Sequence, residues 1–175
     1  VNTGLIRFVL SSIPANATIN AATLSVWSLV GGGGSGSTCD MYRILPARIG
    51  WSESQATWNE YSVGNSWFGG GGVGTLDIDT SGPIASVFIP AAAATQCNFT
   101  ISTSQMQSIL ANNAGMLFYS ASADDAAFSS SDDATPGLRP LLTISYNVTT
   151  YGSQRRFFLR NRHLPAVGRL PGAAQ

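Results

Sequence analysis

Short segments in which apolar and polar residues alternate, each ending at a glycine or proline signal, follow one another along most of this 175-residue chain. In residues 22–29 the alternation places Leu24 on one face of an extended strand and Trp27 on the opposite face. Residues 38–45 alternate in the same way and stop at Pro46. A succession of such segments predicts an all-β fold built from antiparallel strands.

The expected strands are residues 5–10, 22–29, 38–45, 75–80, 95–102, 115–120 and 138–146. One short helix is expected near residues 104–112, because Ser104 can cap it and Met106 and Ile109 share its apolar side. The glycine tract at residues 31–36 is expected to form the exposed tip of a hairpin.

Residues 50–67, GWSESQATWNEYSVGNSW, hold three of the four tryptophans but show no strand or helix periodicity. Such large apolar rings should fold the segment back over a core as a long, ordered connection. We expect Trp51 and Trp58 to be buried and structural. Tyr61 and Trp67, which stand among Gly, Ser and Asn, are the candidates for an exposed carbohydrate-binding platform.

Several stretches of the sequence together resemble one known type of domain. They are WSE at 51–53, ATWN at 56–59, LIRFVLSSIP at 5–14, ATLSVW at 22–27 and RPLLTISY at 139–146. They are similar to the hallmarks of DNRLRE-type domains, which are carbohydrate-binding-module-like β-sandwiches of tailed-phage structural proteins and microbial cell-surface proteins. The resemblance covers about residues 5–146 and implies an antiparallel β-sandwich of jelly-roll type.

One part of that family pattern is missing from this sequence. DNRLRE-type domains usually begin with two further strands, and only residues 2–4 could be the end of these. The resemblance therefore implies a sheet with an open edge, which proteins normally cover or charge. Another chain, or a part that precedes Val1, is expected to fill this edge.

The charges divide the chain into a domain over residues 1–147 and an extended arm over residues 148–175. All nine acidic residues lie in the domain, whereas five of the nine arginines lie in the arm, and there is no lysine. The expected assembly interface consists of Tyr151, Arg155, Arg156, Phe157, Phe158, Arg160 and Arg162. Because aromatic residues and arginine anchor interfaces, we expect contacts within a homo-oligomer or with other virion proteins. Packing of the arm against its own acidic domain is the alternative.

Cys39 and Cys97 lie far apart in two alternating segments, and two interpretations stay open. Both can be buried free thiols. A Cys39–Cys97 disulfide would instead close a long loop, worth about 4 kcal/mol in the chain-entropy model. No window approaches the ~18 consecutive apolar residues of a membrane span, and no signal peptide is recognisable. We therefore expect no membrane association, in a chain that is either processed or part of something longer.

Groups suited to catalysis or metal binding are few. His163 is the only histidine and has no Ser, Cys or carboxylate at motif spacing, so no enzymatic activity is expected. The candidates for a calcium site are Asp77, Asp79, Asp124 and Asp125, since calcium takes hard oxygen ligands from loops. Solvated turn residues are the alternative, and no other cofactor is expected. The acidic domain and the lack of a folded basic face argue against nucleic acid.

Two classes of function fit these observations and the resemblance. The first is a non-enzymatic structural protein on the outer surface of a virion, as a capsid decoration (cement) or tail component of a tailed phage, held by its C-terminal arm. The second is a glycan-binding or adhesive module of a microbial cell-surface or secreted protein. The arginine-aromatic arm favours the first class, because a surface module should continue into further modules or an anchor.

Overall fold

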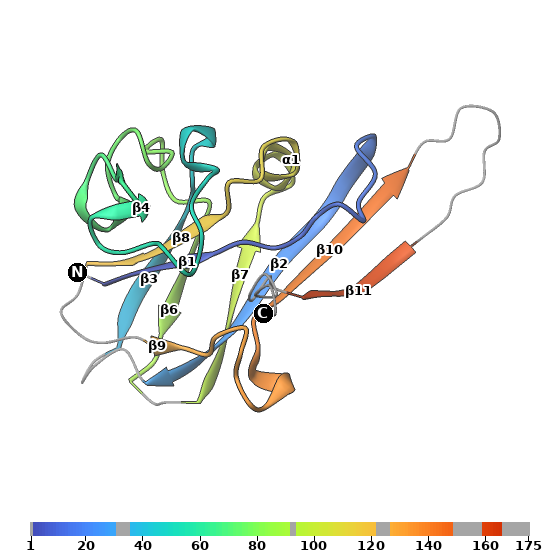
Figure 1. Ribbon diagram of the computed structural model, residues 1–175. Helices are drawn as coiled ribbons and strands as arrows, with labels where there is room; N and C mark the ends of the chain where they lie inside the picture. Colours follow the sequence, from blue (N-terminus) through green and yellow to red (C-terminus); the bar gives the residue numbers. More distant parts are fainter. Residues whose placement is uncertain (1, 31–35, 92–93, 122–126, 149–158, 166–175) are drawn as a thin grey trace, which may run out of the picture.

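A computed structural model describes residues 2–30, 36–91, 94–121, 127–148 and 159–165 of the chain (Figure 1). Over these residues the chain is mostly antiparallel β-sheet with one α-helix of nine residues. No helix within the described ranges is long and apolar enough to cross a membrane. The prediction of a mostly β fold with antiparallel strands and one short helix is confirmed.

One sheet contains four strands in the order β1-β8-β3-β6. These are β1 (Asn2–Ile6), β8 (Met116–Ser120), β3 (Ser37–Arg43) and β6 (Ala85–Ile89). The sheet joins distant parts of the chain, because Ile6 of β1 lies opposite Met116 of β8. β1 and β6 form the two edges of this four-stranded sheet.

The second sheet contains five strands, four of them in the order β11-β10-β2-β7. They are β11 (Leu159–Pro165), β10 (Leu141–Val148), β2 (Ala17–Val30) and β7 (Thr95–Ile101), while the short β9 (Ala127–Phe128) also pairs with β2. The long β2 is central, since Thr23 lies between Thr143 of β10 and Thr100 of β7. Figure 1 shows β2 and β10 running side by side.

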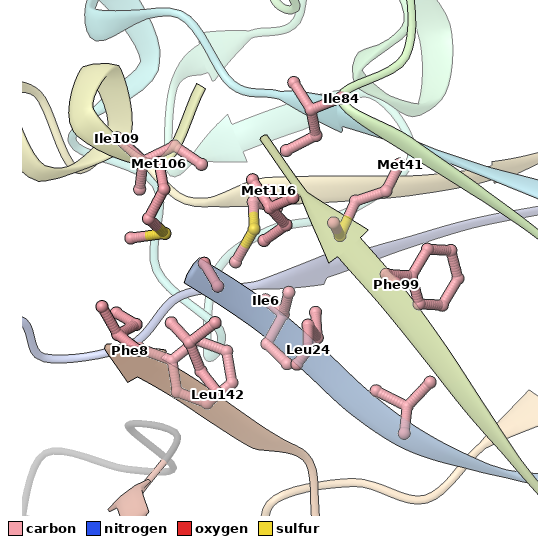
Figure 2. Packing of buried hydrophobic residues seen from close by; sticks show 14 of the residues in the cluster. Ile6, Phe8, Leu24, Met41, Ile84, Phe99, Met106, Ile109, Met116 and Leu142 are labelled. Carbon is pink, nitrogen blue, oxygen red and sulfur yellow. The ribbon is translucent and has the colours of Figure 1, made fainter. Parts of the chain in front are cut away.

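The main core draws buried side chains from both sheets. Leu24 and Phe99 come from the five-stranded sheet, and Met41 and Met116 come from the four-stranded sheet (Figure 2). Burying one such large apolar side chain contributes about 1.5–3 kcal/mol. In β2 the buried positions alternate as predicted, so the alternation of this segment did identify its core face.

The α-helix α1 (Thr103–Ala111) follows β7, and it begins and ends one residue earlier than predicted. Ser102, not Ser104, is its N-cap and accepts a hydrogen bond from the backbone N–H of Gln105. Met106 and Ile109 are buried in the main core, as expected. The helix therefore closes one end of the space between the sheets.

Cys39 of β3 and Cys97 of β7 are buried in the same core on opposite sheets. Both are free thiols in the structure, so the disulfide alternative is not the arrangement that the structure contains. Burial raises the pKa of the Cys39 thiol to about 12 and also raises the pKa of Cys97. The two thiols thus pack as small apolar side chains.

A second layer covers the outer face of the four-stranded sheet. Residues 45–84, which connect β3 to β6, are called the loop layer here; Figure 1 shows its segment around β4 beside β8 and β1. The layer contains η1 (Pro46–Arg48), β4 (Glu60–Ser62), β5 (Asn65–Ser66) and η2 (Gly70–Gly72). It packs on Leu117 of β8, whose neighbours Met116 and Phe118 face the main core. β8 is therefore apolar on both faces.

Several predicted elements differ from the structure. The first strand ends at Ile6, and Phe8 forms only an isolated bridge. β2 and β3 lie in different sheets and do not pair as a hairpin, and residues 31–35 of the predicted hairpin tip lie outside the described residues. Residues 75–80 contribute only the single bridge of Ile78 to Ile44, because a turn occupies this region. In contrast, β6 forms a strand that the sequence analysis did not predict.

Part of the predicted arm belongs to a sheet of its own chain. β11 pairs antiparallel with β10, with Tyr146 opposite Leu159 and Leu141 opposite Pro165. Over residues 159–165 the backbone therefore lies along the edge of the five-stranded sheet. Residues 149–158 and 166–175 lie outside the described residues.

Candidate functional site

Asp77 is the polar centre of the loop layer. Its carboxylate is fully buried, at 0 % exposure, and accepts hydrogen bonds from the backbone N–H groups of Phe68, Gly69 and Gly74 at 2.9, 2.9 and 3.1 Å. Arg48 Nε donates a fourth, at 2.7 Å. Burial raises the pKa of Asp77, but the hydrogen bonds from Phe68, Gly69 and Arg48 and the charge of Arg48 outweigh it and leave the pKa below its usual range. One carboxylate thus gathers the loop of residues 68–77.

Two arginines hold the loop layer: Arg7 connects it to the segment that follows β1, and Arg48 binds residues within the layer. Arg7 donates to the carbonyls of Ile49 and Trp51 at 2.7 and 3.0 Å, and its guanidinium lies 4.7 Å from the centre of the Trp51 ring. Arg48, already bound to Asp77, lies 4.9 Å from the centre of the Tyr61 ring. These contacts combine charge-assisted hydrogen bonds with cation–π attraction, which sets the positions of both rings.

The order of burial among the tryptophans differs from the prediction. Trp51, at 5 % exposure, is buried as predicted, and its indole N–H donates to the carbonyl of Ala114. Trp67 is also buried, at 6 %, and donates to the carbonyl of Thr57 at 3.0 Å. Its prediction as an exposed platform is wrong, because the ring is buried in a second cluster and lies 5.5 Å from Tyr61 between ring centres. This cluster, called the small core here, consists of Ile44, Trp51, Trp67, Ile78, Ala114 and Leu117.

Trp58, predicted to be buried, is 50 % exposed. Its ring lies against the backbone of Gly70 and Gly71: a Cβ atom added at either glycine would meet the ring at 2.7 Å. The N–H of Gly71 donates to the carbonyl of Trp58 at 2.7 Å, and Gly71 has a φ of 72°, which favours glycine. The ring of Trp58 is therefore half exposed to solvent, and the backbone of Gly70 and Gly71 packs against it.

A cleft of about 350 Å³ opens beside the Trp58 ring. Its apolar lining comes from Leu5, Ala56, Gly71 and the rings of Trp51, Trp58 and Trp67. Its polar lining comes from Thr3, Glu53 and Thr57. Glu53 is thus the one charged side chain that the described part of the chain places at this cleft, which lies between β1 and the loop layer.

The aspartates predicted to bind calcium are engaged with arginine where the structure describes them. Asp79 forms an ion pair with Arg43 at 2.8 Å and accepts from the hydroxyl of Ser81 at 2.7 Å. Asp77 pairs with Arg48, while Asp124 and Asp125 lie outside the described residues. Within the described ranges, no group of three or more His, Cys, Asp or Glu side chains could hold a metal ion. The calcium site stays a prediction.

The assembly residues of the arm are placed only in part. Tyr151, Arg155, Arg156, Phe157 and Phe158 lie outside the described residues. Arg160, Arg162 and His163 are in β11, and only the backbone of this strand is described. The interface that we predict for these residues stays a prediction.

The chain matches no protein-family model, and comparisons with curated proteins and with solved structures find no significant match.

Sequence reasoning missed the residues that organise the loop layer. The sequence analysis assigned no role to Arg7 and Arg48, and it named Asp77 as a calcium candidate. One signal was present: Asp77 lies between the apolar Leu76 and Ile78, and the next charged residue, Asp79, has the same sign and cannot balance its charge. A carboxylate between apolar residues, with arginines elsewhere in the domain, favours a buried ion pair.

Proposed function

We propose that this chain is a non-enzymatic structural protein on the outer surface of a virion, as a capsid decoration or tail component of a tailed phage. The proposed architecture is a jelly-roll β-sandwich. Two antiparallel sheets with a shared core support the sandwich, and pairing of β1 with the distant β8 supports the jelly roll. The sequence motifs that resemble DNRLRE-type domains support the virion setting.

The outer edge of β1 is the observation that supports an assembly role. Among the described residues β1 pairs with β8 alone, so the backbone groups on its other side can accept a further strand. A hollow of about 360 Å³ opens beside this edge and is lined by Gly4, Phe118 and Phe128. A strand added at β1 would place apolar side chains in this hollow. The donor would be a neighbouring subunit or a preceding segment of the same chain.

Gly4 offers a test of this edge in the full chain. A Cβ atom at Gly4 would lie 3.7 Å from Phe118 Cδ2, an ordinary contact, so Gly4→Ala should fold and assemble normally. Gly4→Lys should block strand addition, because its ammonium would lie at the edge and the hollow. We expect light scattering after size exclusion to show a homo-oligomer for the first variant and a monomer for the second. The double variant Phe157→Ala, Phe158→Ala should weaken the oligomer in the same assay.

Equal assembly of Gly4→Lys and the unaltered chain would contradict the β1 edge as an interface. Equal assembly of the phenylalanine variant would contradict the arm. Removing all residues after Asn147 is a poorer test, since it also takes β11 away from β10. Phe68→Ala is a control for the loss of aromatic rings, because Phe68 is 62 % exposed in the loop layer and far from the arm in sequence.

The alternative function, a glycan-binding or adhesive module of a microbial surface or secreted protein, is favoured by one specific observation. Trp58 presents a supported, half-exposed indole at a cleft with a polar rim. This feature fits ligand binding and has no role in the packing of the main core.

A further inference from the structure

We infer that the cleft beside Trp58 binds a carbohydrate with neutral or amino-bearing sugar rings, one of which stacks on the exposed indole. The inference rests on the glycan-binding alternative above and assigns its site to other residues than Tyr61 and Trp67.

The Trp58 ring is half exposed and yet fixed in position. A tryptophan can bury 150–250 Å², so leaving half of it in solvent forgoes stabilisation that Trp51 and Trp67 obtain. The ring is nevertheless held in place by the backbone of Gly70 and Gly71. A ring that is fixed before a ligand arrives loses little conformational entropy on binding. Trp58 is therefore a preorganised contact surface.

The lining of the cleft combines an aromatic wall with a few polar side chains. The face of an indole carries negative charge density, which attracts the C–H groups on the apolar face of a sugar ring. The N–H groups of Trp51 and Trp67 already donate to protein carbonyls and are not available to a ligand. The polar side chains at the rim that can contact a ligand include Thr3, Glu53 and Thr57. This combination of an aromatic wall and a few polar groups is typical of ligand sites, and 350 Å³ lies at their small end.

The charge of the cleft selects the class of sugar. Among the described residues Glu53 is the one charged side chain that lines the cleft, and it gives this lining a negative charge. A carboxylate accepts hydrogen bonds from sugar hydroxyls and attracts an ammonium group, but it repels carboxylate, sulfate and phosphate. Thr57 Oγ1 already accepts from the N–H groups of Asn59 and Glu60, so its hydroxyl hydrogen is left to donate. Acidic sugars and nucleic acids are therefore disfavoured.

The test is a titration of the full chain with three soluble probes, followed by tryptophan fluorescence and calorimetry. Cello-oligosaccharides are the neutral probe, chitosan oligosaccharides the cationic probe and oligogalacturonates the acidic probe. We expect binding of the neutral or the cationic probe, with a blue shift of the emission as the indole of Trp58 leaves water. The acidic probe should bind at least about tenfold more weakly.

Three variants locate the site. Trp58→Ala should raise Kd by about tenfold or more, with little change in Tm because the ring is half exposed. Gly71→Ala retains the indole but pushes against it at 2.7 Å, so it should also weaken binding. Glu53→Gln should remove the discrimination against the acidic probe. The matched control is Phe68→Ala, which removes an exposed ring that does not line the cleft and should leave Kd unchanged.

Each opposite result overturns the inference. Tightest binding of the acidic probe would contradict the sugar class while retaining a glycan-binding function. Binding of none of the probes would contradict both the class and the glycan-binding alternative, and the assembly of the Gly4 variants would be unaffected. An equal loss of affinity in Phe68→Ala and Trp58→Ala would show that the ligand lies elsewhere.

Discussion

The main core and the loop layer both bury aromatic and aliphatic side chains, but they do so by different means. In the main core, regular strands place every second side chain between two sheets, as β2 does with Leu24 and Val26. In the loop layer, short irregular segments are gathered by the carboxylate of Asp77 and the guanidinium of Arg48. Burial in the first region follows from backbone periodicity. In the second it follows from a few polar anchors.

The largest expected effect is a difference in unfolding free energy between alanine variants of Trp51 and Trp58, both of which the sequence predicted to be buried. Trp51→Ala should lower the free energy of unfolding by about 3–5 kcal/mol, because it leaves a cavity and an unpaired carbonyl at Ala114. Trp58→Ala should lower it by less than about 1 kcal/mol, since the ring is half exposed. Urea unfolding of both variants measures the difference. Equal losses would show that Trp58 is as structural as Trp51.

A smaller effect is expected when the polar anchor is weakened without changing its shape. Asp77→Asn keeps one acceptor oxygen but leaves Arg48 without its charged partner, so the free energy of unfolding should fall by about 2–3 kcal/mol. Hydrogen exchange should accelerate at the amides of Phe68, Gly69 and Gly74 while amides of β2 and β10 remain protected. Equal acceleration in those strands would show that the loop layer and the main core open as one unit.

The smallest effect is a pH dependence at the edge of the loop layer. The hydrogen bond from Arg43, together with those from Ser81, lowers the pKa of Asp79 to about 2 from an ordinary value of 3.8. A lowered pKa stabilises the folded state above pH 4, and this contribution is lost as the pH falls towards 2. Asp79→Asn should reduce the fall in unfolding free energy over that interval by about 1 kcal/mol, because the pair is partly exposed. Identical curves between pH 5 and 2 for both proteins would contradict this contribution.

Sequence periodicity predicted strands such as β2, which bury one face and leave the other more exposed. It failed at residues 75–80, where a turn has the same alternation of apolar and polar residues. Residues 75–80 alternate, but the apolar Leu76 is exposed and the buried residues are the consecutive Asp77 and Ile78. The alternation therefore does not mark one buried face here, because a turn buries a carboxylate with four donors next to an apolar side chain. β6 was missed for a different reason. Pro83 and Pro90 stand on either side of it, and such closely spaced prolines favour a loop or a short helix.

The site could be predicted in kind but not in its residues. A cluster of tryptophans among Gly, Ser and Asn indicated an aromatic surface, yet Trp58 and Trp67 have similar neighbours in sequence. Their burial is decided by contacts from elsewhere: Trp67 packs with Leu117 of β8 in the small core, and Trp58 meets the glycines of η2. Such long-range packing leaves no local signal. Gly70 and Gly71 support the ring of Trp58, and nothing in their sequence indicates this contact.

The pairing of β1 with β8 has a consequence for synthesis of the chain on the ribosome. β1 leaves the ribosome early, but its partner Met116–Ser120 follows only after the loop layer, β6, β7 and α1 have been made. Until then, Leu5 and Ile6 stay without the strand that buries them, and β8 itself needs cover on both faces when it emerges. Pairing of β1 with β8 across so long a stretch of chain is slow. Until β8 is made, β1 can form contacts with other nascent chains.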